Sequence, residues 1–213
     1  MKVVPMIFNT DMVKALMAGD KVVTRRPVKI DYERGMNGPV VRGRNGEVSV
    51  LSFAPIAGLC PFGNIGDLIY VRETFRMFNH SDECGCSDYC ACPPSGTPVY
   101  FATCGGDSES KWKPSIHMPR TASRLTLKVT DVRIERVQDI TEEQAIKEGI
   151  NKHHKLPAFK SPIGYHTSPV YAFEELWNSI YGNWEENPYV WVIEFEVIHQ
   201  NVDKYLESVK ERP

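Results

Sequence analysis

The chain has 213 residues, a length that suits one domain with a sizeable core. Its formal net charge of −2 argues against a general polyanion binder driven by counterion release. Apolar residues make up 42%, which is ordinary for a globular protein, and no segment has the uninterrupted apolar length that crosses a bilayer. The apolar run that ends at Phe8 is too short for a signal peptide, so we expect a cytoplasmic protein with no membrane partner.

The first residues predict a strand at 3–8 and a helix at 10–18. Asn9 and Thr10 are suitable caps for the start of this helix. Gly19 follows the last apolar-periodic residue, where a helix end favours a residue that can adopt positive φ.

A polar corner follows this helix. The β-branched run 22–24 predicts a strand, which places Lys21 at the turn from helix to strand. Arg25 and Arg26 should point to opposite faces of that strand, so one of them lies beside Lys21 or Thr24. Such a corner suits a site for an anionic ligand, but cations at a helix end also occur simply because they complement its dipole.

The next segment, 30–66, is rich in Gly, Pro, Arg and Asn and predicts a long surface excursion with one hairpin. A Gly-Asp turn then leads into a strand at 68–75. Glu73 lies on this strand and is a candidate for facing a binding pocket.

A cysteine cluster comes next, with four of the six cysteines in a Cys-x-Cys-x3-Cys-x-Cys pattern. Such short spacings allow one loop to wrap a tetrahedral Zn²⁺ in a closed structural site, while free thiols or a disulfide acquired during purification are the alternatives. His80 and Cys104 are reserve ligands, and no organic cofactor is expected. The four predicted metal ligands are Cys84, Cys86, Cys90 and Cys92.

The segment 112–120 contains Pro114 and Pro119 and therefore cannot be a regular helix or a central strand; a short strand at 99–102 precedes it. Trp112 beside Lys113 can stack a base and pair its phosphate, with Ser115 near them, or the Trp can simply plug the end of a barrel.

The C-terminal half alternates strands and helices. Residues 124–137 predict a long strand with a bulge near Thr130, and 141–149 a helix with a capping box. Glu148 falls in its last turn, where a carboxylate opposes the helix dipole, and such a local violation indicates function. Further predictions are a loop at 151–169, a helix at 170–181, a central strand at 189–198, and a charged helix or tail at 200–213.

Four stretches together resemble the ASCH family of the PUA-like superfamily, in the longer form found in phages and prophages. The corner matches the signature Gly-x-Lys-x-x-Thr-x-Arg through Gly19, Lys21, Thr24 and Arg26. The other three stretches are 66–74, 112–120 and 139–150. The resemblance implies an α+β fold, a small mixed β-barrel with flanking helices and long loop insertions. It covers a single domain at 1–199, with inserts at about 30–65, 78–98 and 151–169.

Family members with amidohydrolase activity deacylate the exocyclic amine of acetylated cytidine, and the resemblance assigns them a Lys-Thr-Glu triad. Carried over, the triad is Lys21, Thr24 and Glu148. Thr24 would be the nucleophile and Lys21 its base, provided that burial and the neighbouring arginines lower the lysine pKa.

Three functions stay open from the sequence. The first is an amidohydrolase acting on N-acylated cytidine-type nucleosides. The second is a non-catalytic module that binds RNA, and the third is a phage interaction protein that uses the cysteine-rich insert. Recognition of a nucleoside, a nucleotide or single-stranded RNA is common to the first two. We expect substrate contacts from Arg25, Arg26, Glu73, Trp112, Lys113 and Ser115.

Overall fold

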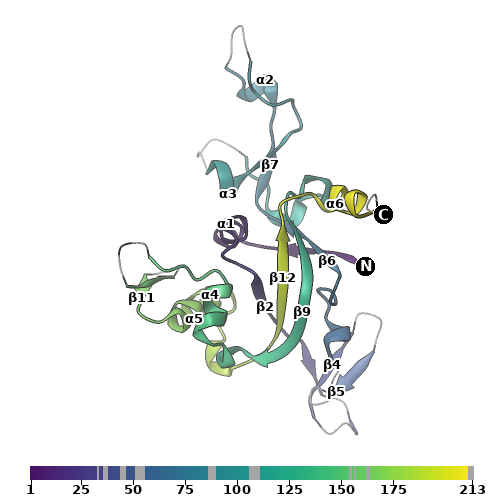
Figure 1. The fold of residues 1–213 in the computed structure, drawn as a ribbon, viewed down its shortest axis with the longest axis vertical. Helices are drawn as coiled ribbons and strands as arrows, with labels where there is room; N and C mark the ends of the chain where they lie inside the picture. Colours follow the sequence, from purple (N-terminus) through teal and green to yellow (C-terminus); the bar gives the residue numbers. More distant parts are fainter. Residues whose placement is uncertain are drawn as a thin grey trace.

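The computed structural model describes residues 1–32, 34–35, 38–43, 47–50, 56–85, 90–105, 111–153, 155, 157–161 and 164–210. It is a mixed α+β structure built on a five-stranded sheet in the order β1-β6-β9-β12-β2 (Figure 1). β1 and β6 pair in parallel, and the other neighbours are antiparallel. The strands of this sheet are β1 (Val3–Ile7), β2 (Val23–Pro27), β6 (Leu68–Arg72), β9 (Thr126–Arg136) and β12 (Tyr189–Ile198).

The inner strand β12, which lies between β9 and β2, separates two hydrophobic clusters, because its side chains alternate between the faces of the sheet. Trp191, Ile193 and Phe195 pack into one cluster, and Val190 and Val192 pack into the other. All five side chains are buried, which explains the nearly continuous apolar run in this strand. The strand predicted at 189–198 is confirmed.

Helices cover both faces of the sheet. Helix α1 (Thr10–Ala18) contributes Val13 and Leu16 to the first cluster. The second cluster is covered by α4 (Glu142–Lys147) and α5 (Pro169–Ile180). The N-terminal half of α4 is fixed by the predicted capping box, with Thr141 and Gln144 each accepting a hydrogen bond from the backbone amide of the other.

Smaller elements extend from this body. An arm formed by the hairpin β7–β8 and by α2 projects away from the sheet in Figure 1. We define the arm as the described residues of 75–100. The small strands are β3 (Ile30–Asp31), β4 (Val40–Arg42), β5 (Val48–Val50), β7 (Phe75–Met77), β8 (Pro98–Tyr100), β10 (Phe159–Lys160) and β11 (Tyr165–His166), and the remaining helices are α2 (His80–Glu83), α3 (Phe101–Cys104) and α6 (Val202–Lys210).

Several local predictions are corrected. The strand predicted at 68–75 is two strands, since β6 ends at Arg72 and β7 begins at Phe75. The strand predicted at 99–102 ends at Tyr100, because Phe101 begins the short helix α3. The excursion at 30–66 holds a three-stranded sheet, β3-β4-β5, rather than one hairpin.

Other predictions are confirmed. The register of β9 against β12 shifts between Glu194 and Phe195, which leaves Thr130 as the extra residue of a bulge. The C-terminal segment forms the helix α6. No helix in the described part of the chain has the length and apolar character needed to span a membrane.

The outer strands of the sheet, β1 and β2, are not hydrogen-bonded to each other through their backbones in the described residues. The Arg26 side chain bridges them instead, donating from Nη2 to the Ile7 carbonyl oxygen at 2.9 Å. The closed PUA-like barrel therefore stays a prediction.

Candidate functional site

The corner after α1 is held against the end of α4. Gly19 ends α1 with φ of 79°, and the Asp20 amide donates to the Ala15 carbonyl at 2.9 Å. Lys21 then forms an isolated antiparallel bridge with Glu148, and the Val22 amide donates to the Lys147 carbonyl at 2.9 Å. Two segments more than one hundred residues apart in sequence are thus joined through their backbones.

Gly149 makes this close approach possible. Its φ is 96°, and a Cβ atom there would lie 2.9 Å from the Ala15 Cβ and 3.2 Å from the Lys21 Cβ. Any other residue would push α4 away from α1 and the corner. The glycine predicted to end the α4 helix therefore also brings Glu148 next to Lys21.

Lys21, Arg25 and Glu148 form a buried ionic network. The Lys21 Nζ donates to Glu148 Oε2 at 2.5 Å and to the Glu148 carbonyl oxygen at 2.8 Å. The Arg25 Nη1 donates to Glu148 Oε1 at 3.1 Å. Lys21 is 0% exposed, Arg25 2% and Glu148 4%, so both oxygens of the carboxylate are used by cations inside the protein.

Two further acceptors complete this network. The Arg25 Nη2 donates to Gln144 Oε1 at 2.9 Å and to Glu135 Oε2 at 3.2 Å. The Gln144 side-chain oxygen therefore accepts hydrogen bonds both from the Thr141 amide of the capping box and from Arg25. The unfavourable carboxylate at the helix end is explained, because Glu148 is the counter-ion of two buried cations.

The electrostatics of Lys21 follow from its burial. Loss of solvation lowers the lysine pKa, and the opposing effect of the nearby Glu148 carboxylate is smaller. The neighbouring Arg26 and Arg25 guanidinium groups lower it further. The pKa of Lys21 therefore lies below its ordinary value.

Thr24 does not join the network. It pairs with Ile193 of β12 and lies on the face of β2 opposite Val23 and Arg25. Among the described residues, no hydrogen bond links its hydroxyl to Lys21 or to Glu148, and its side chain is buried. The structure therefore brings together two members of the predicted triad and places the third apart from them.

A cavity of about 440 Å³ lies beside the network. Glu148 and Gly149 line it, and neither Lys21 nor Thr24 does. Its other charged residues are Lys14, Lys160, Asp11 and Asp20, and α1, Ile150 and Leu176 add apolar surface to the wall. Glu148 is thus the member of the network with access to this cavity.

A second hollow of about 610 Å³, which we call the arginine cleft, lies where β1, β2, β6 and the end of α5 meet. Its charged side chains are Arg26 and Arg72, and Asn9 and Tyr181 add polar groups. The apolar part of the wall comes from Pro5, Met6, Ile7, Met12, Phe62, Ile116 and Ile180.

Both arginines of the cleft are held in place. Arg26 lies with its guanidinium carbon 5.2 Å from the centre of the Phe8 ring, and its Nη1 is 3.4 Å from the Tyr181 hydroxyl. Arg72 donates from Nη2 to the Ile116 carbonyl oxygen. The Nε of Arg72 is buried and has no hydrogen-bond partner in the described structure. Two positioned cations therefore share one concave, mostly apolar surface.

The other predicted contact residues lie elsewhere. Trp112 packs edge-on against Phe101 at 5.1 Å between ring centroids, with the Arg76 guanidinium carbon 5.3 Å from its ring centre. Lys113 pairs through its backbone with Phe75 at the base of the arm. Ser115 starts a short 3-10 helix, and only its neighbour Ile116 reaches the arginine cleft. The base-stacking prediction for Trp112 is therefore not supported by its position.

Glu73 is a partner of Arg124. The guanidinium donates to both carboxylate oxygens, at 2.8 and 2.9 Å, and its carbon lies 4.0 Å from the Tyr100 ring centre. Glu73 is buried and lines neither the cavity nor the arginine cleft. Its role in the structure is to fix the strand that leads into the arm.

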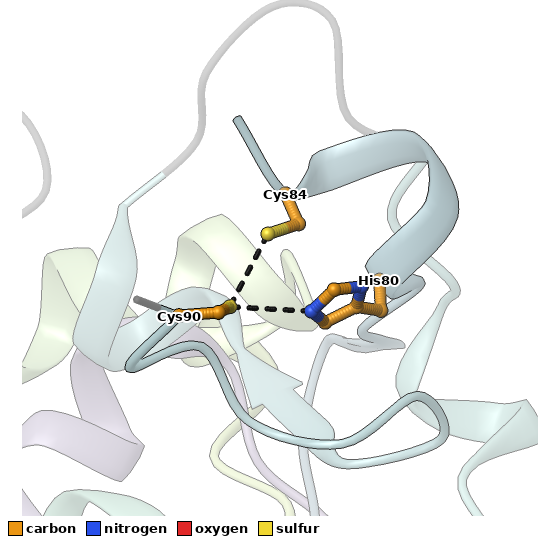
Figure 2. Close-up of side chains that lie close together, drawn as sticks. All are labelled: His80, Cys84 and Cys90. Carbon is orange, nitrogen blue, oxygen red and sulfur yellow. Dashed lines mark hydrogen bonds between the residues drawn. The ribbon is translucent and has the colours of Figure 1, made fainter. Parts of the chain in front are cut away.

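The cysteine cluster gathers around the Cys90 thiol (Figure 2). The Cys84 Sγ and the His80 Nε2 each lie 3.2 Å from the Cys90 Sγ. Hydrogen bonds, first from the Cys84 thiol and then from the Cys92 amide and His80, lower the pKa of Cys90 to about 6. Cys86 lies outside the described residues, and Cys104 belongs to α3, apart from the cluster.

Sequence reasoning missed Arg72 and Tyr181 of the cleft and Gln144 of the buried network. Arg72 is the last residue of β6 but lay inside the strand predicted at 68–75, so the sequence did not mark it as the end of an element. Tyr181 caps the amphipathic helix α5, and a polar side chain at the end of an element is the signal that could have marked it.

No protein-family model matches the chain, and no match was found among curated proteins or among solved structures. Membership of the ASCH family therefore stays a prediction that rests on the motifs of the sequence.

Proposed function

We propose that this protein recognises a nucleotide, or one nucleotide of a single RNA strand, in the arginine cleft, as a PUA-like module of the ASCH type. The observation that carries the proposal is the pairing of Arg26 and Arg72 across a concave apolar surface. Guanidinium groups bind phosphate through charge-assisted, bidentate hydrogen bonds. A hollow of about 610 Å³ lies in the range of small-ligand sites.

The cleft offers complementary surfaces to the two parts of a nucleotide. Arg26 and Arg72, which both line the cleft, supply guanidinium donors for the phosphate. Phe62, Tyr181 and Ile116 provide apolar and aromatic area for a base. The cleft also joins three stretches on which the ASCH resemblance rests, because Arg26 comes from the corner, Arg72 from 66–74 and Ile116 from 112–120.

This proposal is tested by titrating the protein with CMP, UMP, AMP and GMP and with the matching nucleosides in a calorimeter. We expect the nucleotides to bind at least tenfold more tightly than the nucleosides, because the phosphate interacts with both arginines. The salt dependence should be shallow, with a slope of about −0.7 per phosphate contact, as for single strands. Equal affinity for a nucleotide and its nucleoside would contradict the assignment of a phosphate to the cleft.

A second candidate function is hydrolysis of an acyl group from an N-acylated cytidine-type nucleoside at the 440 Å³ cavity. It is favoured by a buried lysine whose pKa is lowered and whose partner, Glu148, lines that cavity. Glu148 can act as the general base toward a water molecule in the cavity and then pass that proton to the leaving amine, while Lys21 and Arg25 hold the carboxylate in place. Thr24 lies on the other face of β2 from Arg25 and does not line the cavity, so this candidate function uses a water molecule as the nucleophile.

Release of cytidine from N-acetylcytidine, followed by liquid chromatography, tests this candidate. We expect Glu148→Gln to abolish release because the carboxylate faces the cavity, whereas Thr24→Val should retain it. Loss of activity in Thr24→Val with an unchanged fold would instead support the triad of Lys21, Thr24 and Glu148. If the wild-type protein releases no cytidine, the hydrolase candidate is contradicted and nucleotide binding remains as the proposed function.

A further inference from the structure

Beyond Phe78, the described part of the arm has no hydrophobic core of its own. No described side chain between residues 79 and 98 is buried, and the two limbs of the hairpin separate after Phe78. A protruding segment of this kind needs a cross-link or a metal ion to hold one conformation. The cysteine cluster lies at this point of the arm.

The donor atoms come from both limbs. His80 and Cys84 are four residues apart on α2 and its C-terminal cap, so both face the same side of one helical turn. Cys90 approaches from the returning limb, and the His80 amide also donates to the Ser95 hydroxyl of that limb at 2.9 Å. One ion bound here would therefore tie the outgoing limb to the returning limb.

The distances fit a tetrahedral ion. The Sγ atoms of Cys84 and Cys90 are 3.2 Å apart, Cys90 Sγ and His80 Nε2 are 3.2 Å apart, and all three donors lie within 4.8 Å of one another. Bond lengths of about 2.3 Å to sulfur and 2.0 Å to nitrogen place tetrahedral ligand atoms about 3.5–3.8 Å apart. A small outward shift of the three side chains makes room for the ion.

We propose that His80, Cys84 and Cys90 bind a structural Zn²⁺ and that Cys92 supplies the fourth ligand. Cys92 lies next to Cys90, because its amide donates to the Cys90 Sγ at 3.4 Å and its thiol is hydrogen-bonded to that sulfur. Histidine therefore replaces one cysteine of the set expected from the spacing. Binding releases the thiol protons to solvent, and the closed ligand set gives the ion a structural role.

The test uses the untagged full-length protein, loaded with Zn²⁺, desalted and analysed by mass spectrometry of the metal. We expect about one zinc per chain. His80→Ala, Cys84→Ser, Cys90→Ser and Cys92→Ser should each weaken zinc binding more than about 100-fold, since even the outer partners of a metal site contribute about 10–100-fold. Cys104→Ser and His199→Ala are matched controls outside the cluster and should retain zinc.

Amide hydrogen exchange provides a second measurement. Removal of zinc should speed exchange in α2 and in 90–98 and leave the β9–β12 pair unchanged, because the ion orders only the arm. A wild-type protein that retains no zinc would overturn the proposal, as would full retention in His80→Ala and Cys90→Ser. Loss of zinc in Cys86→Ser but not in Cys92→Ser would overturn the assignment of Cys92.

Discussion

Replacing Glu148 by alanine is expected to lower the free energy of unfolding by about 3–5 kcal/mol, the cost of removing one partner from a buried ion pair. The carboxylate neutralises both Lys21 and Arg25, and neither cation is exposed enough to be solvated instead. For a chain of this size, a loss of that order corresponds to a fall of about 6–20 °C in the melting temperature. Urea unfolding followed by circular dichroism measures the change.

Two comparisons make this prediction specific. The partly exposed pair Arg120–Asp203 is a control, because Asp203→Asn should cost only about 0–1 kcal/mol. The double variant Lys21→Met with Glu148→Leu should be less destabilised than Glu148→Ala, because it no longer buries an ammonium group without a counter-ion. A loss below about 1 kcal/mol in Glu148→Ala would show that the network does not hold the corner against α4.

Removing either arginine of the cleft is expected to cause a large loss of affinity for the nucleotide. We expect Arg72→Ala and Arg26→Ala each to weaken nucleotide binding about 10–100-fold, since a hydrogen bond to a charged group contributes about 1.5–3 kcal/mol. Lysine in place of Arg72 should restore part of the affinity, because it keeps the charge and loses the fork of donors. Calorimetric titration with the nucleotide that the wild-type protein binds best measures these changes.

Lys29→Ala is the matched control for the cleft arginines. Lys29 belongs to the same basic stretch of sequence, but it is exposed and lines neither the cavity nor the cleft. Its removal should change affinity less than twofold at physiological salt. An equal loss in Lys29→Ala and Arg72→Ala would indicate diffuse attraction to a basic surface in place of a defined site.

Local sequence patterns predicted the elements well wherever one signal dominated. Helix α1 and strand β12 have the predicted bounds, since caps and Gly19 define the first and a continuous apolar run defines the second. The capping box of α4 and the bulge at Thr130 were also predicted. The break between Arg72 and Phe75 was missed, because the β-forming residues continue across it.

The site was predictable only in part, for a physical reason. Glu148 was identified because it violates the helix dipole, and its burial against two cations explains the violation. The arginine cleft could not be predicted, because it is assembled from β1, β2, β6, 112–120 and α5. Trp112 lies apart from the cleft, because its ring packs against Phe101 and Arg76, and base stacking by this residue stays a prediction.

Photochemical cross-linking with 4-thio-UMP tests the central proposal most directly, because it reports where a bound nucleotide lies. The peptides that carry the modification are identified by mass spectrometry, with excess UMP as competitor. Nucleotide recognition in the arginine cleft predicts competed cross-links at Tyr181, Phe62 or Ile116, which are lost in Arg72→Ala. Competed cross-links confined to the arm or to the cavity beside Glu148 would contradict it.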